Sequence, residues 1–366
     1  MHSTLLLVIV VVAAFAFDFT NGFHDTANVV ASAISTRSLS PNTAITLAAV
    51  LNFVGAFISL KVAATVATGI VDAGQVTETI AFAGLTGAIA WNLITWWAGL
   101  PSSSSHALIG AVVGATLAAV GGGAVHRAGI IDKVVIPGLI APVAAFVAAG
   151  VAIIVVYALF GRRRPGAVTR AFRLGQIVTS SLLALAHGTN DAQKTMGVLT
   201  LALVAHGDLS PRHATVPAWV VIGAATAIAL GTYAGGWRII RTVGMRIIRM
   251  DAAQGFAAQA AGAAVILLSS HFGYPLSSTH VISGGVMGAG AAKRLSAVRW
   301  GVAGSIAVAW VLTLPVAGLF GAAFYALTTV FGSGVLGPLL ITIIALAALT
   351  WGLAVRHRRE PTAASA

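Results

Sequence analysis

Three aspartates are the side chains of this sequence most able to do chemistry, because each interrupts an apolar stretch. The 366-residue chain has nine acidic residues, of which Asp18, Asp25 and Asp191 lie inside apolar segments. A carboxylate there costs at least about 2.5–3.5 kcal/mol on insertion scales, and such a residue is functional by default. The alternative is a packing or snorkelling aspartate. A repeated motif around Asp25 and Asp191 favours function for both, whereas both interpretations stay open for Asp18.

Short oxygen-bearing side chains surround two of these aspartates. Residues 21–28 read NGFHDTAN and residues 187–194 read HGTNDAQK. Each stretch contains a glycine that lets a helix loosen, and carboxylate, amide and freed carbonyl oxygens suit a hard cation such as Na⁺. A proton relay suits the same groups, and a histidine beside the first aspartate favours it, since His titrates near pH 6.5. The predicted site for a coupling cation or proton comprises Asp25, Asp191, Asn21, Asn28 and His24, with Asp25 and Asp191 as the ligands of a sodium ion.

Two runs of hydroxyl residues form the second chemical feature. Residues 101–106 read PSSSSH and residues 275–280 read PLSSTH. Proline ends one helix and Ser or Thr caps the next, whose free N–H groups and partial positive charge favour an anion. Capping alone needs a single hydroxyl, so the duplicated runs indicate a tetrahedral oxyanion held from two sides. The predicted oxyanion ligands are Ser103, Ser104, Ser105, Ser277, Ser278, Thr279, Asn190 and Lys194.

Other polar residues each have two interpretations. Lys194 lies three residues after Asp191 and shares its helix face, so it either neutralises that carboxylate or contacts the anion. His106 and His280 are either core histidines or supporting groups that relay protons or donate to the anion. Four amide side chains lie in apolar segments, and interhelical hydrogen bonding explains them as well as function does: Gln254, Gln259, Asn52 and Asn92. Of these, only Gln254 is included among the predicted supporting residues.

The composition requires lipid as the solvent. The chain is 58% hydrophobic and 8% charged, against about 25% charged residues in soluble domains. A formal net charge of +12 could suggest nucleic acid, but the arginines cluster at the flanks of apolar segments, as at cytoplasmic membrane boundaries. The chain has no cysteine, which excludes disulfides and thiolate metal sites. No basic region precedes the apolar N-terminus, so we interpret it as a retained first span and not a secretory signal.

Apolar runs long enough to span a bilayer recur along the whole chain. Two further regions, 79–122 and 252–292, are too long for one span and are broken by Pro, so each is predicted as a re-entrant hairpin or a tight helix pair. No ten-residue segment alternates with period two, which argues against a β-barrel. The predicted single spans are 4–34, 43–69, 134–160, 174–205, 216–235, 300–329 and 335–355.

The two halves of the chain match each other. Residues 22–25 align with 188–191, residues 99–106 align with 273–280, and glycines at 110 and 114 correspond to glycines at 284 and 288. Such pairs indicate inverted repeats with a substrate site near the midplane. We therefore predict an all-α membrane protein with inverted repeats, broken helices or re-entrant hairpins, and about 10–12 membrane segments. The predicted divisions are a first repeat at 1–160 with its N-terminus outside, a basic cytoplasmic linker at 161–173, a second repeat at 174–355 and a cytoplasmic tail at 356–366.

These motifs resemble the inorganic phosphate transporter (Pit/PiT) family from about Phe15 to Leu314. That family has a duplicated Asn-Asp signature in two inverted halves and Pro-Ser-rich hairpins that end in His. The resemblance implies symport of phosphate with Na⁺ or H⁺ and a homodimer in the plasma membrane. The first signature has His24 in place of the usual Asn, and in this it resembles the bacterial low-affinity, proton-coupled branch of the family. That resemblance implies neutral metal–phosphate as a candidate cargo. The linker at 162–173 is short, so the large cytoplasmic insertion of many relatives, and any regulation by it, does not carry over.

The sequence thus predicts phosphate import by alternating access, with H⁺ or Na⁺ and no other cofactor. Positive charge must enter with the anion, because a phosphate cannot lie beside two carboxylates alone. A sulfate or other oxyanion permease of the same fold is the nearest alternative, and a passive anion channel is an alternative of another class. A membrane enzyme using Ser105 and His106 is disfavoured, since neighbours in sequence are no evidence of Ser-to-His hydrogen-bond geometry.

Overall fold

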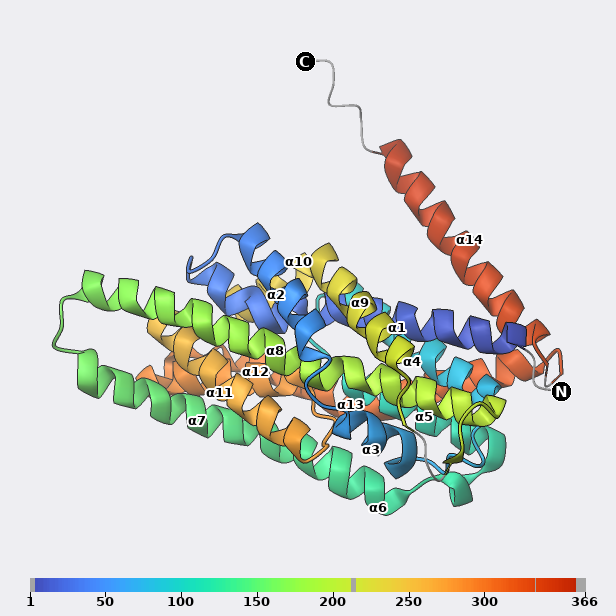
Figure 1. The fold of residues 1–366 in the computed structure, drawn as a ribbon. Coiled ribbons are helices and arrows are strands. Elements are labelled where there is room, and N and C mark those ends of the chain that lie inside the picture. Colours follow the sequence, from blue (N-terminus) through green and yellow to red (C-terminus); the bar gives the residue numbers. More distant parts are fainter. Residues whose placement is uncertain (1–3, 212–214, 333, 360–366) are drawn as a thin grey trace.

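The protein is a bundle of helices aligned along one long axis (Figure 1). The computed structural model describes residues 4–211, 215–332 and 334–359. Within them, β-structure is limited to an isolated bridge between Val71 and Val125. The helices are α1 (Thr4–Ser35), α2 (Pro41–Gly55), α3 (Lys61–Gly69), α4 (Glu78–Ala98), α5 (Ser104–Val120), α6 (Arg127–Ile130), α7 (Ile136–Phe160), α8 (Pro165–His206), α9 (Ala218–Ala234), α10 (Trp237–Arg241), α11 (Ala252–His271), α12 (Ser278–Lys293), α13 (Trp300–Thr329) and α14 (Leu336–Arg359).

The outer helices have the surface of a membrane protein. Among the described residues, five helical stretches are long and apolar enough to cross a bilayer, and four shorter apolar helices accompany them. Along α7, the large side chains of Leu139, Val143 and Val147 are more than half exposed. Small residues on the opposite face of α7, such as Ala145 and Ala149, are fully buried. This distribution, with large apolar residues facing out and small ones facing the next helix, is that of a lipid-facing helix.

The packing of the first half recurs in the second. Helix α5 packs on α13, and α12 packs on α7. Likewise α2 packs on α8, and α9 packs on α1. The glycines that match between the halves make these contacts, because a Cβ on Gly114 would collide with the backbone of Gly318, and one on Gly288 with that of Phe146. The matching glycines thus let helix backbones approach closely at equivalent places.

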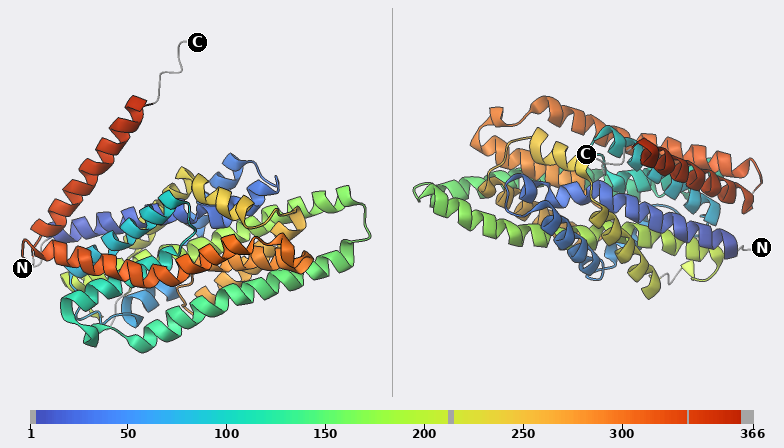
Figure 2. Two further views of the ribbon diagram at one scale, coloured as in Figure 1. Left: turned by 180° about the vertical axis from the view of Figure 1, so that it is seen from behind. Right: turned by 90° about the horizontal axis from the view of Figure 1, so that it is seen from above.

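Two hairpins meet at the middle of the molecule. The regions 79–122 and 252–292, predicted to break in the middle, form the pairs α4–α5 and α11–α12. Each turn contains a glycine with positive φ, Gly99 at 66° and Gly273 at 77°. Figures 1 and 2 show that α4–α5 lie toward the end that carries the N-terminus, and α11–α12 toward the end with the α7–α8 turn. The tips touch, because the hydroxyl of Ser105 donates to the carbonyl of Leu276 at 2.9 Å.

The predicted single span 43–69 is wrong, since residues 56–60 separate α2 from α3. Side chains of α8 satisfy the backbone groups at this break. The Thr189 hydroxyl donates to the Gly55 carbonyl at 2.9 Å. The amide oxygen of Gln193 accepts from the N–H groups of Val62 and Ala63 at 2.9 and 3.1 Å. Because the capping groups lie more than 120 residues away in the chain, the local sequence gives no sign of the break.

Other boundaries shift as well. Helix α8 begins at Pro165, a residue favoured in the first turn of a helix, so most of the predicted linker 161–173 is helical. Of the predicted tail 356–366, residues 356–359 continue α14, and residues 360–366 lie outside the described residues. Helix α14 leaves the bundle at an angle (Figures 1 and 2). The remaining predicted spans correspond closely to α1, α7, α9 and α13.

The close helix approaches yield a first prediction. Gly114→Ala and Gly288→Ala should each lower the free energy of unfolding by about 1–3 kcal/mol, because the added methyl meets backbone atoms that have no room to yield. The matched control is Gly304→Ala in α13, where a Cβ meets nothing within 4 Å. That change should be neutral or stabilise by up to about 1 kcal/mol. Thermal unfolding in detergent measures all three, and equal effects at the three positions would contradict the assignment.

Candidate functional site

The candidate site lies where α1 and α8 meet the two hairpin tips. Helix α1 carries the stretch 21–28 and α8 carries 187–194, while residues 103–106 and 277–280 begin α5 and α12. Every residue predicted for the site is buried, and the most exposed, His106, shows 7% of its surface. The structure therefore gathers both predicted residue sets in one place that is closed to solvent.

The signature stretches do not loosen their helices. We predicted that Gly22 and Gly188 would free backbone carbonyls for a cation, but α1 and α8 are continuous through them. Both glycines instead make room for a neighbour: a Cβ on Gly22 would collide with the Ile228 carbonyl of α9, and one on Gly188 with the Asn52 carbonyl of α2. The polar groups that α1 and α8 contribute to the site are therefore side chains and not backbone carbonyls.

Asp25 accepts hydrogen bonds from both hairpins. Ser104 of the first hairpin donates to its Oδ2 at 2.5 Å, and Thr279 of the second donates to its Oδ1 at 3.1 Å. Asn28, one turn along α1, donates to the same Oδ1 at 3.1 Å and to the Thr279 hydroxyl at 2.8 Å. His24 Nδ1 lies 2.9 Å from Asp25 Oδ1. Four side chains from three helices therefore satisfy this buried carboxylate.

Asp191 has the corresponding place on α8. Lys194 Nζ donates to its Oδ1 at 2.6 Å, and Ser278 of the second hairpin donates to its Oδ2 at 3.3 Å. The ammonium group also donates to the carbonyl of Leu276 at 2.7 Å and to the hydroxyl of Ser105. All three donors of Lys194 are therefore used, two of them at the hairpin tips. Lys194 therefore pairs with Asp191 and also contacts Ser105, a predicted oxyanion ligand, while its contact with an anion stays a prediction.

Asn28 and Lys194 are equivalent residues of the two halves. Each lies three residues after its aspartate and bonds to it, and each reaches across to the last hydroxyl of the opposite hairpin run, Thr279 or Ser105. The contacts match but the charges differ, since an amide occupies one side and an ammonium the other. One half of the site therefore carries a basic side chain that the other half lacks.

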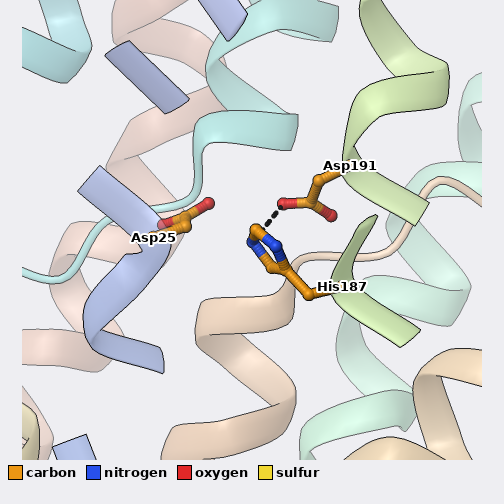
Figure 3. A group of neighbouring side chains, drawn as sticks. All are labelled: Asp25, His187 and Asp191. Carbon is orange, nitrogen blue, oxygen red and sulfur yellow. Dashed lines mark ion pairs between the residues drawn. The ribbon is translucent and has the colours of Figure 1, made fainter. Parts of the chain in front are cut away.

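Figure 3 shows the two aspartates facing each other across His187. One ligand atom from each of Asp25, His187 and Asp191 lies within 4.8 Å of the others, and all three residues are buried. His187 Nε2 lies 3.2 Å from Asp191 Oδ2, and its Nδ1 lies 3.1 Å from the amide oxygen of Asn52. Carboxylates and imidazole are ligands of divalent ions such as Zn²⁺, and a carboxylate–histidine pair can equally hold a proton.

Two residues beside the aspartates have different partners. His24 Nε2 lies 3.2 Å from the Thr95 hydroxyl and 3.4 Å from that of Ser102, so it links Asp25 to the first hairpin. Asn190 donates to Ser270 at 2.8 Å and to the Tyr274 carbonyl at 3.1 Å. Asn190 thus holds the turn of the second hairpin, while its Oδ1 has no partner among the described residues.

The remaining hydroxyls cap the hairpin helices. The Ser103 hydroxyl accepts from the N–H of His106 at 3.1 Å, and the Ser277 hydroxyl accepts from that of His280 at 3.3 Å. Both are N-cap residues with extended backbone, as predicted from the prolines before them. The N-termini of α5 and α12 are thereby fixed close to Asp25 and Asp191.

Three predicted supporting residues do not contact the carboxylates. The rings of His106 and His280 lie edge to face at 4.8 Å, and His280 also lies over Trp310 of α13 at 4.2 Å. The hydrogen-bond partner of His280 Nδ1 is the Gly138 carbonyl of α7, at 3.5 Å. Gln254 closes the capping box at the start of α11 with Asp251 and donates to the Ala289 carbonyl. Its contacts are therefore those of a structural residue.

The sequence predictions missed His187, Asn52 and Gln193. His187 lies four residues before Asp191, hence on the same helix face, and this spacing was the available signal. For Asn52, interhelical hydrogen bonding and function are equally good explanations from the sequence, and the predicted site does not include it. It donates to Thr232 at 2.9 Å, and its amide oxygen lies 3.1 Å from His187 Nδ1. No local signal assigns a capping role to Gln193, because the helix that it caps, α3, lies about 130 residues earlier in the chain.

Carboxylates enclosed by apolar helices, next to opposed helix N-termini, are features of a membrane transporter with a central substrate site. The chain belongs to the phosphate transporter family, whose model matches residues 21–321. It is therefore a multi-pass membrane protein of a transporter family and not an enzyme.

Similar proteins support this membership. The chain is 51% identical over 359 residues to a Mycobacterium bovis protein named "Probable low-affinity inorganic phosphate transporter", covering 97% of this chain and 85% of that protein. A Bacillus subtilis protein of the same name is 44% identical over 330 residues, with 89% and 98% covered. A solved structure described as "The sodium-dependent phosphate transporter" has a TM-score of 0.81 over 87% of this chain and 98% of that one, at 24% identity. That last likeness concerns the fold.

The Lys194–Asp191 pair yields a second prediction. Lys194→Met should lower the free energy of unfolding by about 3–5 kcal/mol, because it leaves the buried Asp191 carboxylate without its cation. The double variant Lys194→Met/Asp191→Asn should recover most of that loss. As a control, Lys293→Met removes the partner of Asp251 in a pair whose side chains are about half exposed, and should cost less than about 1 kcal/mol. Thermal unfolding in detergent compares them, and an equal loss in the single and double variants would contradict the charge pairing.

Proposed function

We propose that this chain imports inorganic phosphate together with a proton across the plasma membrane. The observation that carries the proposal is the direct hydrogen bonding of side-chain hydroxyls at the two hairpin tips to a buried pair of aspartates. Ser104 and Thr279 bond to Asp25, while Ser278 bonds to Asp191. Groups that suit an anion and groups that suit a cation are therefore in contact in one closed site.

The hairpin tips supply the donors for phosphate. The first N–H groups of a helix have no intrahelical partner, and the helix dipole adds partial positive charge there. Helices α5 and α12 present such ends from opposite directions, and the hydroxyls of Ser104, Ser105, Ser278 and Thr279 lie beside them. Lys194 adds an ammonium group in contact with Ser105. A tetrahedral oxyanion would receive hydrogen bonds from both tips.

The charge of the site explains why a cation must accompany phosphate. Two carboxylates face one ammonium group, so a phosphate dianion would bring further negative charge into a buried place. Each aspartate has its own histidine, His24 beside Asp25 and His187 beside Asp191. Imidazole is a common proton carrier and a poor ligand for Na⁺, so these pairs favour H⁺ as the coupling ion. Sodium is the alternative, since the similar solved structure is described as sodium-dependent.

Metal–phosphate is the form of cargo that best fits the group in Figure 3. Asp25, His187 and Asp191 offer oxygen and nitrogen ligands within 4.8 Å of one another. A divalent ion held there would be cargo, with its phosphate on the hairpin hydroxyls, and the neutral pair would enter with less charge to compensate. A sulfate permease would use the same hydroxyls, so competition by sulfate is the test of the anion.

Alternating access fits the placement of the hairpins. Their tips close the site between them, and they extend toward opposite ends of the bundle (Figure 2). Separation of one tip from α1 and α8 would open the site toward one end only. A passive channel needs no such closed state and no aspartate. The homodimer implied by the family stays a prediction.

A third prediction tests the carboxylates. Asp25→Asn and Asp191→Asn should each reduce phosphate uptake by proteoliposomes to the level of empty liposomes, because the amide cannot accept the companion charge. Asp208→Asn makes the same chemical change in an exposed loop and should leave uptake unchanged. Protein recovery after reconstitution checks insertion. Uptake retained by both site variants would refute the assignment.

A fourth prediction concerns the coupling ion. An imposed inward proton gradient should drive accumulation of labelled phosphate, whereas an inward sodium gradient at equal pH on both sides should add nothing. Excess sulfate should leave this uptake intact. Accumulation driven only by the sodium gradient would show that the coupling ion is Na⁺ and not H⁺. Phosphate flux that depends on neither gradient would indicate a passive channel. Unequal uptake with and without Mg²⁺ would identify metal–phosphate as the cargo.

A further inference from the structure

Asp18 is a buried carboxylate that the proposed transport cycle has not used. It lies on α1, two turns before Asp25 and thus closer than Asp25 to the N-terminal end of that helix. Its side chain is fully buried. Since Asp25 corresponds to Asp191, the residue that corresponds to Asp18 in the second half is Ala184. Asp18 is therefore an addition to the repeated site.

The carboxylate of Asp18 is only half satisfied. Its Oδ1 accepts a hydrogen bond from the hydroxyl of Thr195 on α8 at 2.6 Å. Its Oδ2 has no hydrogen-bond partner among the described residues. Asp25, by comparison, has four partners and Asp191 has three. A buried charge is ordinarily paired or binds a cation, so the free oxygen indicates a cation or a proton.

A second acceptor without a partner lies one turn further along. Asn21 is 1% exposed, lies three residues after Asp18 on the same helix face, and its amide oxygen has no partner among the described residues. The two fully buried atoms that lack a described partner on this part of α1 are thus both oxygens. Two free oxygens beside a hydroxyl oxygen are the ligands of a small cation, and they do not suit an anion.

These residues belong to a buried polar line on α1. Its members recur every three or four residues, and none is more than 3% exposed. Three members other than Asp18 also have an unpartnered oxygen. The line passes through the proposed site and extends on both sides of Asp25. It consists of Asp18, Asn21, Asp25, Asn28 and Ser32.

We propose that Asp18 and Asn21 of α1, with Thr195 of α8, form a second cation site that receives the coupling ion before it reaches the aspartate pair. The ligand is a small monovalent cation, H⁺ or Na⁺, held about 10 Å from Asp25 along the helix axis. The hydroxyl of Thr195, next to Lys194, joins this site to the helix of Asp191. The inference rests on the proposed symport and assigns Asp18 to ion coupling and not to phosphate.

Two reconstituted assays separate coupling from phosphate binding. One measures accumulation of labelled phosphate against an imposed proton or sodium gradient. The other measures exchange of internal for external phosphate with equal ion concentrations on both sides. Asp18→Asn keeps the size of the side chain and an acceptor for Thr195, but it cannot neutralise a cation. It should keep phosphate exchange near the wild-type rate. Gradient-driven accumulation of phosphate should fall roughly 5–150-fold, the range that corresponds to a typical coupling free energy.

Each outcome has a distinct meaning. Gradient-driven accumulation by Asp18→Asn at the wild-type level would overturn the proposal, because Asp18 would then have only a packing role. Loss of exchange with a native unfolding temperature would also overturn it, by placing Asp18 in the phosphate site. If Asp18→Asn unfolds early, Asp18→Glu keeps the carboxylate and should retain driven accumulation. The gradient that loses its effect identifies the ion. Failure of the wild-type protein to exchange phosphate would instead refute the proposed function.

Discussion

The burial of negative charge is the constraint on which the rest of the structure depends. Asp25 and Asp191 are buried within an apolar bundle, so their hydrogen-bond donors must come from the protein, both from their own helix and from the hairpins. The hairpin tips provide the hydroxyl donors, and the tips can reach the aspartates because glycines let helix backbones approach closely. Formation of the fold and assembly of the site are therefore the same event. A bundle that lost a tip contact would leave a carboxylate under-satisfied.

The two halves solve this problem in nearly the same way, and their differences carry information. Each aspartate accepts a hydrogen bond from a hydroxyl of its own half's hairpin and another from the side chain three residues later on its helix. That side chain is Asn28 in one half and Lys194 in the other. A symmetric site would need two mobile cations to balance two carboxylates. Under the proposed symport, the ammonium group of Lys194 would reduce the number of cations that accompany each phosphate. Asp18 is a further asymmetry, since Ala184 occupies its position in the second half.

The features that the sequence could predict are those written in local residues. The breaks at Pro101 and Pro275, the caps at Ser103 and Ser277 and the repeat itself follow from short motifs, and the structure has the breaks and the caps as predicted. The break between α2 and α3 could not be predicted, because Gln193 of a distant helix caps it. The continuity of α1 and α8 through their glycines also depends on which helix lies opposite. The positions of His106 and His280, away from the carboxylates, follow from contacts with α7 and α13 that no local pattern specifies.

The shared hydroxyl hydrogens would give the proposed coupling of proton and phosphate a thermodynamic basis. Each hydroxyl has one hydrogen, and those of Ser104 and Thr279 are donated to Asp25. Phosphate must compete for them while Asp25 is charged. Once a proton occupies the carboxylate, it no longer needs these donors, and they can turn to the oxyanion. In the proposed symport, proton binding would therefore strengthen phosphate binding, and by linkage phosphate would strengthen proton binding by the same factor. Neither ligand alone would stabilise the loaded, closed site as well as both together, which is the property that separates a symporter from a channel.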